Sequence, residues 1–323
     1  MAKSTNKEKT TVIGAHTAYL AQESDLPKAP AFVGREDELR LCRVAWGLDE
    51  SYRFLESGES NHLAFRLYGS PGMGKNELVY ELVRRIRLNN PTILNLPFYS
   101  MVGHDEMSPE DMVLTVVPTE SSGESRVRMV LRASPLASAI RTGGIFFFDE
   151  LNRLPERALA PLAPALDGRG MLFAASSGIW VEPAKDAFPF RFCCALNPSA
   201  GGDLPAYIDQ RTLPKIRVDY PGHDGLVALL RAQLRSELKP GCAEGQGGQV
   251  SAQPEIVELN DQIETLRRKL YDSGETPSVR QGLTAIRLSR ALVRERGESS
   301  DFAECLELAF EHVFPERIAT TSN

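Results

Sequence analysis

The sequence has few cysteines, few aromatic residues and no excess of basic residues. Its five cysteines, Cys42, Cys193, Cys194, Cys242 and Cys305, form no CxxC pair and no ligand-like spacing with the five histidines. Such a scattered, odd-numbered set is typical of free thiols in a reducing compartment and argues against a zinc site. With 43 acidic and 37 basic side chains, the net charge of -6 argues against a protein that grips nucleic acid through bulk positive charge.

Long apolar runs are also missing. No stretch reaches the roughly 18 residues that a membrane-spanning helix needs, and the N-terminus lacks the continuous apolar segment of a secretory signal. We therefore expect a cytoplasmic protein. The 323 residues, of which 42% are hydrophobic and 25% charged, have the composition of a globular chain of roughly two domains.

Short apolar runs alternate with helical patterns between residues 31 and 220. Such runs are typical of buried strands, and the alternation predicts an α/β fold with a parallel sheet. The helical pattern 155–166 is interpreted as one helix. The predicted strands are 63–68, 92–96, 144–148, 190–196 and 215–218.

Two further pairs of strand-like runs predict inserted β-hairpins, at 113–131 around TESSGES and at 171–181 around SSG. From the pattern alone they are interpreted as plain decoration of the fold.

The two ends of the chain differ from its middle. Residues 1–30 are polar and are interpreted as a flexible N-terminal arm, while 31–220 form the α/β core. After residue 221 strand-like runs vanish and leucines recur at helical spacing, which predicts a small helical domain over 221–323. Residues 240–254, rich in Gly, Gln and Ser, are interpreted as a flexible excursion within it.

A glycine-rich segment lies between a predicted strand and a predicted helix and has the GxxxxGK spacing of a phosphate loop. Its glycines let backbone N–H groups approach phosphate oxygens, and the following helix start adds positive potential. A lysine at the end of this loop reaches the β- and γ-phosphates. The predicted ATP-binding residues are Gly69, Ser70, Pro71, Gly72, Met73, Gly74, Lys75 and Asn76.

Asn76 departs from the usual pattern, in which a Ser or Thr hydroxyl at this position coordinates Mg²⁺. An amide oxygen is a hard ligand that can replace the hydroxyl, but it lies one bond further from the backbone. Because Mg²⁺ demands near-ideal octahedral geometry, we expect slower hydrolysis. Nucleotide binding should survive, since backbone amides and Lys75 supply most of the contacts.

Two carboxylates, Asp149 and Glu150, follow the most apolar strand-like run. Asp149 is predicted to hold Mg²⁺ together with Asn76, and Glu150 to act as general base toward the attacking water. Adjacent acids at a strand end are a weak signal alone. The phosphate loop about 75 residues upstream turns them into a specific one.

Three segments carry a family resemblance: GSPGMGK at 69–75, FFFDELNRLP at 146–155 and ALNP at 195–198. Together they resemble the AAA+ ATPases of the MoxR type, in the dynein-related subgroup, over about residues 31 to 300. The resemblance implies a P-loop NTPase fold, a three-layer α/β/α parallel sheet followed by an all-helical lid. It also implies ATP and Mg²⁺ as cofactors and a homo-oligomeric ring, commonly a hexamer, with ATP bound between subunits.

The resemblance also assigns roles to single residues. Asn197 matches sensor 1, which orients the attacking water, and Arg280 matches sensor 2, which couples the lid to the γ-phosphate. Arg211 falls near the arginine finger that reaches the neighbouring subunit's γ-phosphate, with Arg217 as the alternative. Arg153 of the DELNR segment is implied to lie at a subunit interface.

The function implied is that of a chaperone-like AAA+ ATPase whose ring remodels or activates a partner protein, one with a von Willebrand A domain in this branch. The family resemblance also implies that the two inserted hairpins face the ring pore or a partner, with Phe173 and Trp180 as the apolar contact residues. A different hypothesis is a nucleotide-gated assembly scaffold in which Asn76 weakens or abolishes hydrolysis. A third is an ATPase subunit of a nucleic-acid-processing complex, against which the net charge of -6 speaks.

Overall fold

The computed structural model describes residues 9–27, 32–55, 62–90, 96–120, 127–235, 254–274, 276–297 and 301–314. The chain divides into two compact units. The first, built on strands, comprises Met1–Pro27, Asp37–Gly69 and Lys75–Arg217. The second, built on helices, comprises Lys28–Glu36, Ser70–Gly74 and Val218–Asn323.

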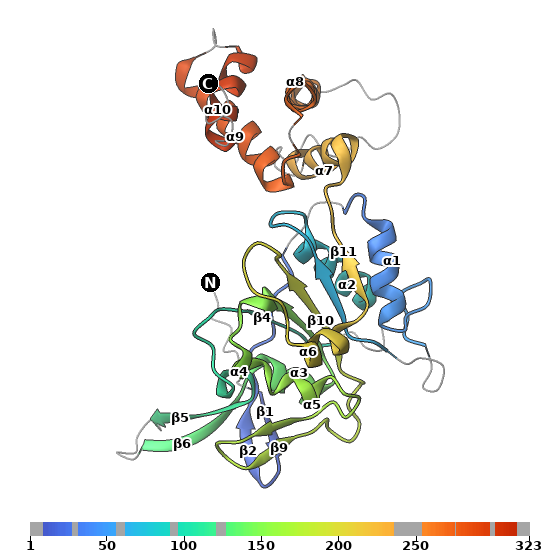
Figure 1. Ribbon diagram of the computed structural model, residues 1–323, viewed down its shortest axis with the longest axis vertical. Coiled ribbons are helices and arrows are strands. Elements are labelled where there is room, and N and C mark those ends of the chain that lie inside the picture. The colour runs from blue at the N-terminus through green and yellow to red at the C-terminus, as the bar shows by residue number, and fades with distance from the viewer. Residues whose placement is uncertain are drawn as a thin grey trace. The chain divides into compact units, whose positions relative to one another are not determined.

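Five parallel strands form the main sheet of the first unit, in the order β11-β3-β10-β7-β4 (Figure 1). They are β3 (Phe65–Tyr68), β4 (Phe98–Val102), β7 (Ile145–Asp149), β10 (Arg191–Leu196) and β11 (Lys215–Arg217). Four of these match predicted strands. Residues 92–95 of the fifth prediction lie outside the described residues, and the strand that the sheet uses nearby is β4, which the sequence analysis missed.

The strand order decides where polar residues gather. β10 lies between β3 and β7, and Leu196 pairs with Tyr68 in the register. Parallel strands end at the same edge of a sheet, which is where α/β proteins bind their ligands. The segments that follow β3, β10 and β7 therefore meet at one edge, with the β10 segment in the middle.

Helices cover the two faces of this sheet. Phe146 and Phe148 of β7 point to the face that shares a core with α3 (Pro135–Thr142). Phe147 points to the other face, where its ring meets Tyr80 of α2 (Lys75–Asn89) edge-on. The three-layer α/β/α fold is confirmed. The helix α1 (Glu36–Ala45) leads into the buried Trp46, whose ring packs on Phe65.

A second sheet has the order β1-β2-β6-β5, from β1 (Thr10–Ile13), β2 (His16–Tyr19), β5 (Leu114–Glu120) and β6 (Val127–Ala133). It confirms the first predicted hairpin. The prediction of a flexible arm is wrong for residues 10–19, because β2 pairs with β6 and buries Ile13 and Ala18. Backbone hydrogen bonds hold this hairpin, and a polar composition does not reveal them.

The second predicted hairpin is confirmed as β8 (Leu172–Ala174) paired with β9 (Ile179–Val181). The single helix predicted over 155–166 is wrong: the chain forms two short helices, α4 (Glu156–Leu159) and α5 (Leu162–Ala165). Pro161 lies between them, and its missing N–H and fixed φ interrupt the hydrogen-bond ladder. The remaining short helices are η2 (Glu110–Met112), η3 (Leu151–Arg153), α6 (Ala206–Asp209) and η4 (Gln210–Thr212).

Four helices build the second unit and confirm the predicted helical patterns. They are α7 (Gly222–Arg235), α8 (Pro254–Ser273), α9 (Val279–Arg296) and α10 (Phe302–Val313). Their core is mostly leucine and isoleucine, with Leu230, Leu266 and Ile286 almost fully buried. Nearly all of the predicted excursion at 240–254 lies outside the described residues. No helix in the described part of the chain is long and apolar enough to cross a membrane.

Candidate nucleotide-binding site

The phosphate loop connects the end of β3 to the start of α2, so Lys75 is the first residue of that helix. The Lys75 side chain is buried, and its Nζ donates to the Gly69 carbonyl at 2.6 Å. Burial lowers the pKa of this amine, while the charges of Asp149 and Glu150 oppose the shift. The structure thus brings the predicted lysine and the predicted acids together in the first unit.

The middle of the loop adopts a backbone that only glycine accepts readily. Gly72 has φ of 75° and Gly74 has φ of 87°. A Cβ at Gly74 would meet nothing within 4 Å, so there the requirement is conformational. At Gly72 a Cβ would come within 2.8 Å of the Ser278 Cβ, so this glycine also permits close packing.

Ser278 is the N-cap of α9, and with Gln281 it forms a complete capping box. Arg280, at the exposed start of α9, is brought near the loop as well: its Cβ lies 3.5 Å from where a Gly72 Cβ would stand. Ser278 and Gly72 belong to the second unit, as does Arg280. The sequence analysis missed the contact of Ser278 with the loop, although its Ser-x-x-Gln spacing is a helix-start signal.

Arg35 is a second residue that the sequence analysis did not single out. Its guanidinium donates to the Met73 carbonyl at 3.1 Å and to the Asp219 carbonyl. It therefore ties the phosphate loop to the chain entering α7. The only sequence signal is its place after Gly34 in the Phe-Val-Gly-Arg entry to the core.

The acidic pair lies at the end of β7. Asp149 accepts two hydrogen bonds, at Oδ1 from the Glu150 backbone N–H at 2.9 Å and at Oδ2 from Asn76 Nδ2 at 2.6 Å. Asn76 thus reaches the carboxylate predicted to share the metal with it. A carboxylate and an amide are hard oxygen donors of the kind that Mg²⁺ takes, so the donor set fits this ion.

Glu150 has a left-handed backbone with φ of 53°, unusual for a residue with a side chain. Its Oε2 accepts a hydrogen bond from Arg153 at 2.7 Å. The carboxylate raises the pKa of the Arg153 guanidinium through this hydrogen bond and its charge. Both side chains are partly exposed, and exposed ion pairs contribute about 0–1 kcal/mol, so this one breaks readily.

Asn197 follows β10, between the other two segments, and is buried. Its Oδ1 accepts from the Ser199 N–H at 3.1 Å, a turn contact. Asn152 brackets its backbone, donating to the Asn197 carbonyl at 2.9 Å and accepting from the Asn197 N–H at 3.3 Å. Asn152 therefore joins the DELNR segment to the loop after β10, a positioning role that the sequence analysis did not assign.

The two candidate arginine fingers lie at opposite ends of β11. Arg217 is its last residue, exposed and paired with Tyr68 next to the phosphate loop of the same chain. Arg211 precedes the strand, in η4, and donates to the Tyr207 carbonyl at 2.7 Å. The two guanidinium groups therefore belong to different edges of the sheet.

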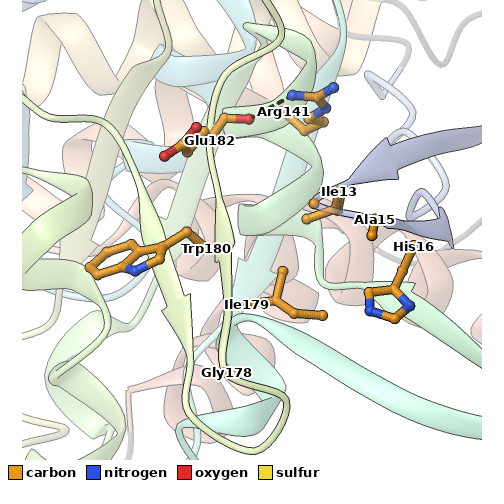
Figure 2. A pocket seen from close by; sticks show the side chains of 9 residues that line it. Ile13, Ala15, His16, Arg141, Gly178, Ile179, Trp180 and Glu182 are labelled. Carbon is orange, nitrogen blue, oxygen red and sulfur yellow. Dashed lines mark hydrogen bonds between the residues drawn. The ribbon is translucent and has the colours of Figure 1, made fainter.

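A hollow of about 330 Å³ lies between the β1–β2 turn and the β8–β9 hairpin (Figure 2). His16, Ile179 and Trp180 are among the residues that line it. Arg141 crosses its rim, donating to the Glu182 carbonyl at 3.1 Å and to Thr11 Oγ1 at 3.2 Å. None of its lining residues is a predicted nucleotide or catalytic residue.

The cysteines and histidines add no metal site among the described residues, which contain no cluster of three or more His, Cys, Asp or Glu side chains placed to hold an ion. Four cysteines are free, as predicted, and all four are buried, while Cys242 lies outside the described residues. Burial raises the pKa of the Cys193 thiol, which keeps it protonated.

Residues 64–212 match the AAA domain of the dynein-related subfamily. The match runs from β3, through the phosphate loop and the acidic pair, to η4. This chain therefore carries an AAA+ domain with the P-loop NTPase fold, and its relatives support the MoxR type.

Relatives of this AAA+ protein include the denitrification regulatory protein NirQ of Stutzerimonas stutzeri, 25% identical over 60% of this chain and 61% of that protein. Protein NorQ of Paracoccus denitrificans is 27% identical over 44% of this chain and 47% of that protein. In both comparisons the chain spans less than two thirds of the relative's length. The NirQ of Pseudomonas aeruginosa is 24% identical over 69% of this chain and 74% of that protein.

Solved structures show the same fold. The ORC2 protein of Aeropyrum pernix, in ADPNP-ADP complexes, aligns with a TM-score of 0.51 and 13% identity over 92% of this chain and 74% of that chain. A RuvB mutant of Thermotoga maritima aligns with a TM-score of 0.50 and 15% identity over 87% of this chain and 70% of that chain.

Proposed function

We propose that this AAA+ protein is an ATP hydrolase that forms a hexameric ring and uses ATP binding and hydrolysis to remodel or activate a partner protein. The observation that carries the proposal is the meeting of Lys75, Asn76 and Asp149 at one edge of the sheet, with Asn197 following the strand between. The name of a relative, the denitrification regulatory protein NirQ, supports a regulatory role.

The residues of the loop would bind the nucleotide in the following way. Backbone amides of 69–74 and the N-terminus of α2 face the phosphates, and Lys75 neutralises the β- and γ-phosphate charge. Asn76 and Asp149 would hold Mg²⁺, which would supply neutralisation of the charge on the transferred phosphate.

Glu150 would act as the general base that takes a proton from the attacking water, and Asn197 would orient that water. To do so, Glu150 leaves Arg153, which an exposed ion pair permits at small cost. Arg211 of the neighbouring subunit would complete the site by stabilising developing negative charge. Arg280 would respond to the γ-phosphate from the start of α9.

The partner would be a protein, and a von Willebrand A domain is the kind of partner that the MoxR resemblance implies. A cytoplasmic location is part of this proposal. A nucleotide-gated scaffold is the second candidate function, because the Asn76 amide donates to Asp149 and so competes with metal coordination.

The test combines calorimetric ATP titration with Mg²⁺-dependent phosphate release for wild type, Glu150→Gln and the exposed control Glu156→Gln. We expect Glu150→Gln to keep the ATP affinity and to lose about 10²–10⁴-fold in kcat, with the control unchanged. Tight ATP binding without phosphate release by wild type would establish the scaffold. Turnover that requires nucleic acid at physiological salt would establish the nucleic-acid alternative.

A further inference from the structure

The strand that leads into the phosphate loop contains a buried arginine. Arg66 is the second residue of β3, which has a parallel neighbour on each side, and its side chain is only 4% exposed. Its backbone partners Cys194 and Lys215 belong to β10 and β11. Burying a charge costs free energy unless it is paired and hydrogen-bonded, and an apolar residue of similar volume often stabilises such a site better. A stability role alone therefore explains this arginine poorly.

All the contacts of the Arg66 guanidinium shown by the structure go to one short segment. Its NH1 atom lies 2.6 Å from Asp209 Oδ1, 3.1 Å from the Asp209 carbonyl and 3.2 Å from Thr212 Oγ1. The Thr212 hydroxyl in turn donates to the Ile208 carbonyl at 3.0 Å. The guanidinium therefore holds both ends of the turn formed by 209–212.

Arg211 lies inside that turn, between the two residues that Arg66 holds. The backbone of Arg66 reaches the same stretch, because its N–H donates to the Pro214 carbonyl at 3.1 Å. Since β3 continues into Gly69, the strand joins the phosphate loop of a subunit to the segment that carries its Arg211. Arg217 lies beyond Lys215 on β11, the strand that pairs with the Arg66 backbone.

We propose that Arg66 is a positioning residue that fixes the Arg211 segment to the phosphate-loop strand, so that each subunit presents Arg211 to its neighbour's nucleotide. The inference rests on the proposed ATP hydrolysis in a ring and deepens it. It assigns the finger to Arg211 rather than Arg217, because the Arg66 guanidinium holds the turn that carries Arg211, whereas Arg217 lies on β11, which pairs with β3 through the backbone. The same contacts would couple the nucleotide state of one subunit to the position of the Arg211 that it presents to the next subunit.

The first experiment measures ATP affinity and kcat of the full-length protein for Arg66→Lys and Asp209→Asn. Lysine keeps the charge but has a shorter, more flexible side chain and lacks the planar guanidinium whose NH1 atom contacts Asp209 and Thr212, so we expect kcat to fall about 10- to 100-fold with ATP affinity within about 2-fold of wild type. The Asp209 side chain is 49% exposed, so Asp209→Asn keeps the test valid if Arg66→Lys does not fold. Unchanged kcat in both variants would overturn the proposal.

The second experiment mixes subunits. A Glu150→Gln subunit lacks its own base but keeps its Arg211, whereas an Arg66→Lys subunit keeps its base. An interface is complete when an Arg66→Lys subunit supplies the base and its Glu150→Gln neighbour supplies Arg211. Because ring interfaces join unlike faces, about one interface in four of an equal mixture has this arrangement. We therefore expect the mixture to exceed the mean of the two separate variants and to recover about a quarter of wild-type phosphate release.

Two reference mixtures separate the possible failures. Arg211→Ala with Glu150→Gln must recover activity if an arginine acts between subunits at all, so failure there overturns the proposed ring mechanism. Recovery there without recovery for Arg66→Lys overturns only the role of Arg66. Arg191→Lys is the matched control, because it is another buried arginine whose hydrogen bonds go to the Trp46 and Pro189 carbonyls and not to the Arg211 turn. Mixing Arg191→Lys subunits with Glu150→Gln subunits should therefore restore no activity.

A double variant gives an independent check. If Arg66 acts only through Arg211, then Arg66→Lys combined with Arg211→Ala is no slower than Arg211→Ala alone. If the double variant instead loses kcat by the product of the two separate losses, Arg66 supports the site of its own subunit.

Discussion

The two units differ in what they bury. Among the described residues, the first unit buries the charged side chains Arg66, Lys75 and Arg191 around its sheet, together with Asn197. In the second unit the buried polar side chains, Gln262, Ser278 and Ser289, are neutral. Buried charges cost stability unless they are paired and hydrogen-bonded. The sheet unit holds the buried charges, among them the Lys75 of the proposed chemistry, whereas the helical unit is an apolar bundle that packs the start of α9 against the loop residues 70–74.

The strongest way to sharpen this comparison is to damage the apolar bundle alone. Leu266 is fully buried in α8, so Leu266→Ala should lower the free energy of unfolding by about 2–5 kcal/mol. Urea unfolding followed by circular dichroism measures this, with Val257→Ala, at an exposed site of the same helix, as the control. A loss below about 1 kcal/mol would mean that this core is not the source of the unit's stability.

The corresponding change in the sheet unit removes a charge. Lys75→Met should weaken ATP binding by at least about 2 kcal/mol, or about 30-fold in Kd, because a buried cation would no longer face the phosphates. Without nucleotide, the same variant should unfold no more easily than wild type. Titration with ATP and thermal melts measure the two effects, with exposed Lys185→Met as the control. Equal ATP affinity in both variants would contradict the assigned role of Lys75.

Alanine substitutions at Gly72 and Gly74 distinguish the effect of backbone strain from that of packing. Both have positive φ, so alanine at either position costs about 1–2 kcal/mol. Only at Gly72 would the new methyl group also meet Ser278, at 2.8 Å. Gly72→Ala should therefore lower the nucleotide-free melting temperature more than Gly74→Ala does. The reverse order would contradict the packing of the loop beneath α9.

A smaller effect is expected at the helix start itself. Ser278→Ala removes the acceptor for the Gln281 N–H and should cost about 1 kcal/mol of stability. Thr284→Ala is the matched control, since that hydroxyl donates to the Arg280 carbonyl from an exposed position. Hydrogen exchange over α9 would show whether the loss is local.

The smallest effect is on the pH dependence of stability. The folded pKa of Lys75 lies below its ordinary value of 10.5, chiefly because of burial. Between the two values the unfolded chain binds more protons, so this group makes stability rise with pH there. The penalty is fully present below the folded pKa and is gone above 10.5. Lys75→Met should remove that rise from the pH dependence of urea unfolding below pH 10.5, and an unchanged slope would contradict it.

Much of the architecture could be predicted from local signals in the sequence. Four strands of the main sheet, both hairpins and the four long helices follow from apolar periodicity and turn residues, which act over neighbouring positions. The phosphate loop and the acidic pair are also readable, because glycines, lysine and carboxylates at fixed spacing serve one chemistry. The segment 155–166 was wrongly predicted as one helix because its apolar spacing was weighed above Pro161, a local signal that predicts the observed break.

Other features depend on partners distant in the chain, and there the folded structure was needed. β2 is a strand because β6 offers it hydrogen bonds, and Asn152 matters because Asn197 lies opposite. In the sequence Arg66 only interrupts an apolar run, and its partners in the turn at 209–212 are visible only in the folded structure. Periodicity records which side of an element is buried, but only packing selects the element that covers it, because contact energies depend on distance in space and not along the chain.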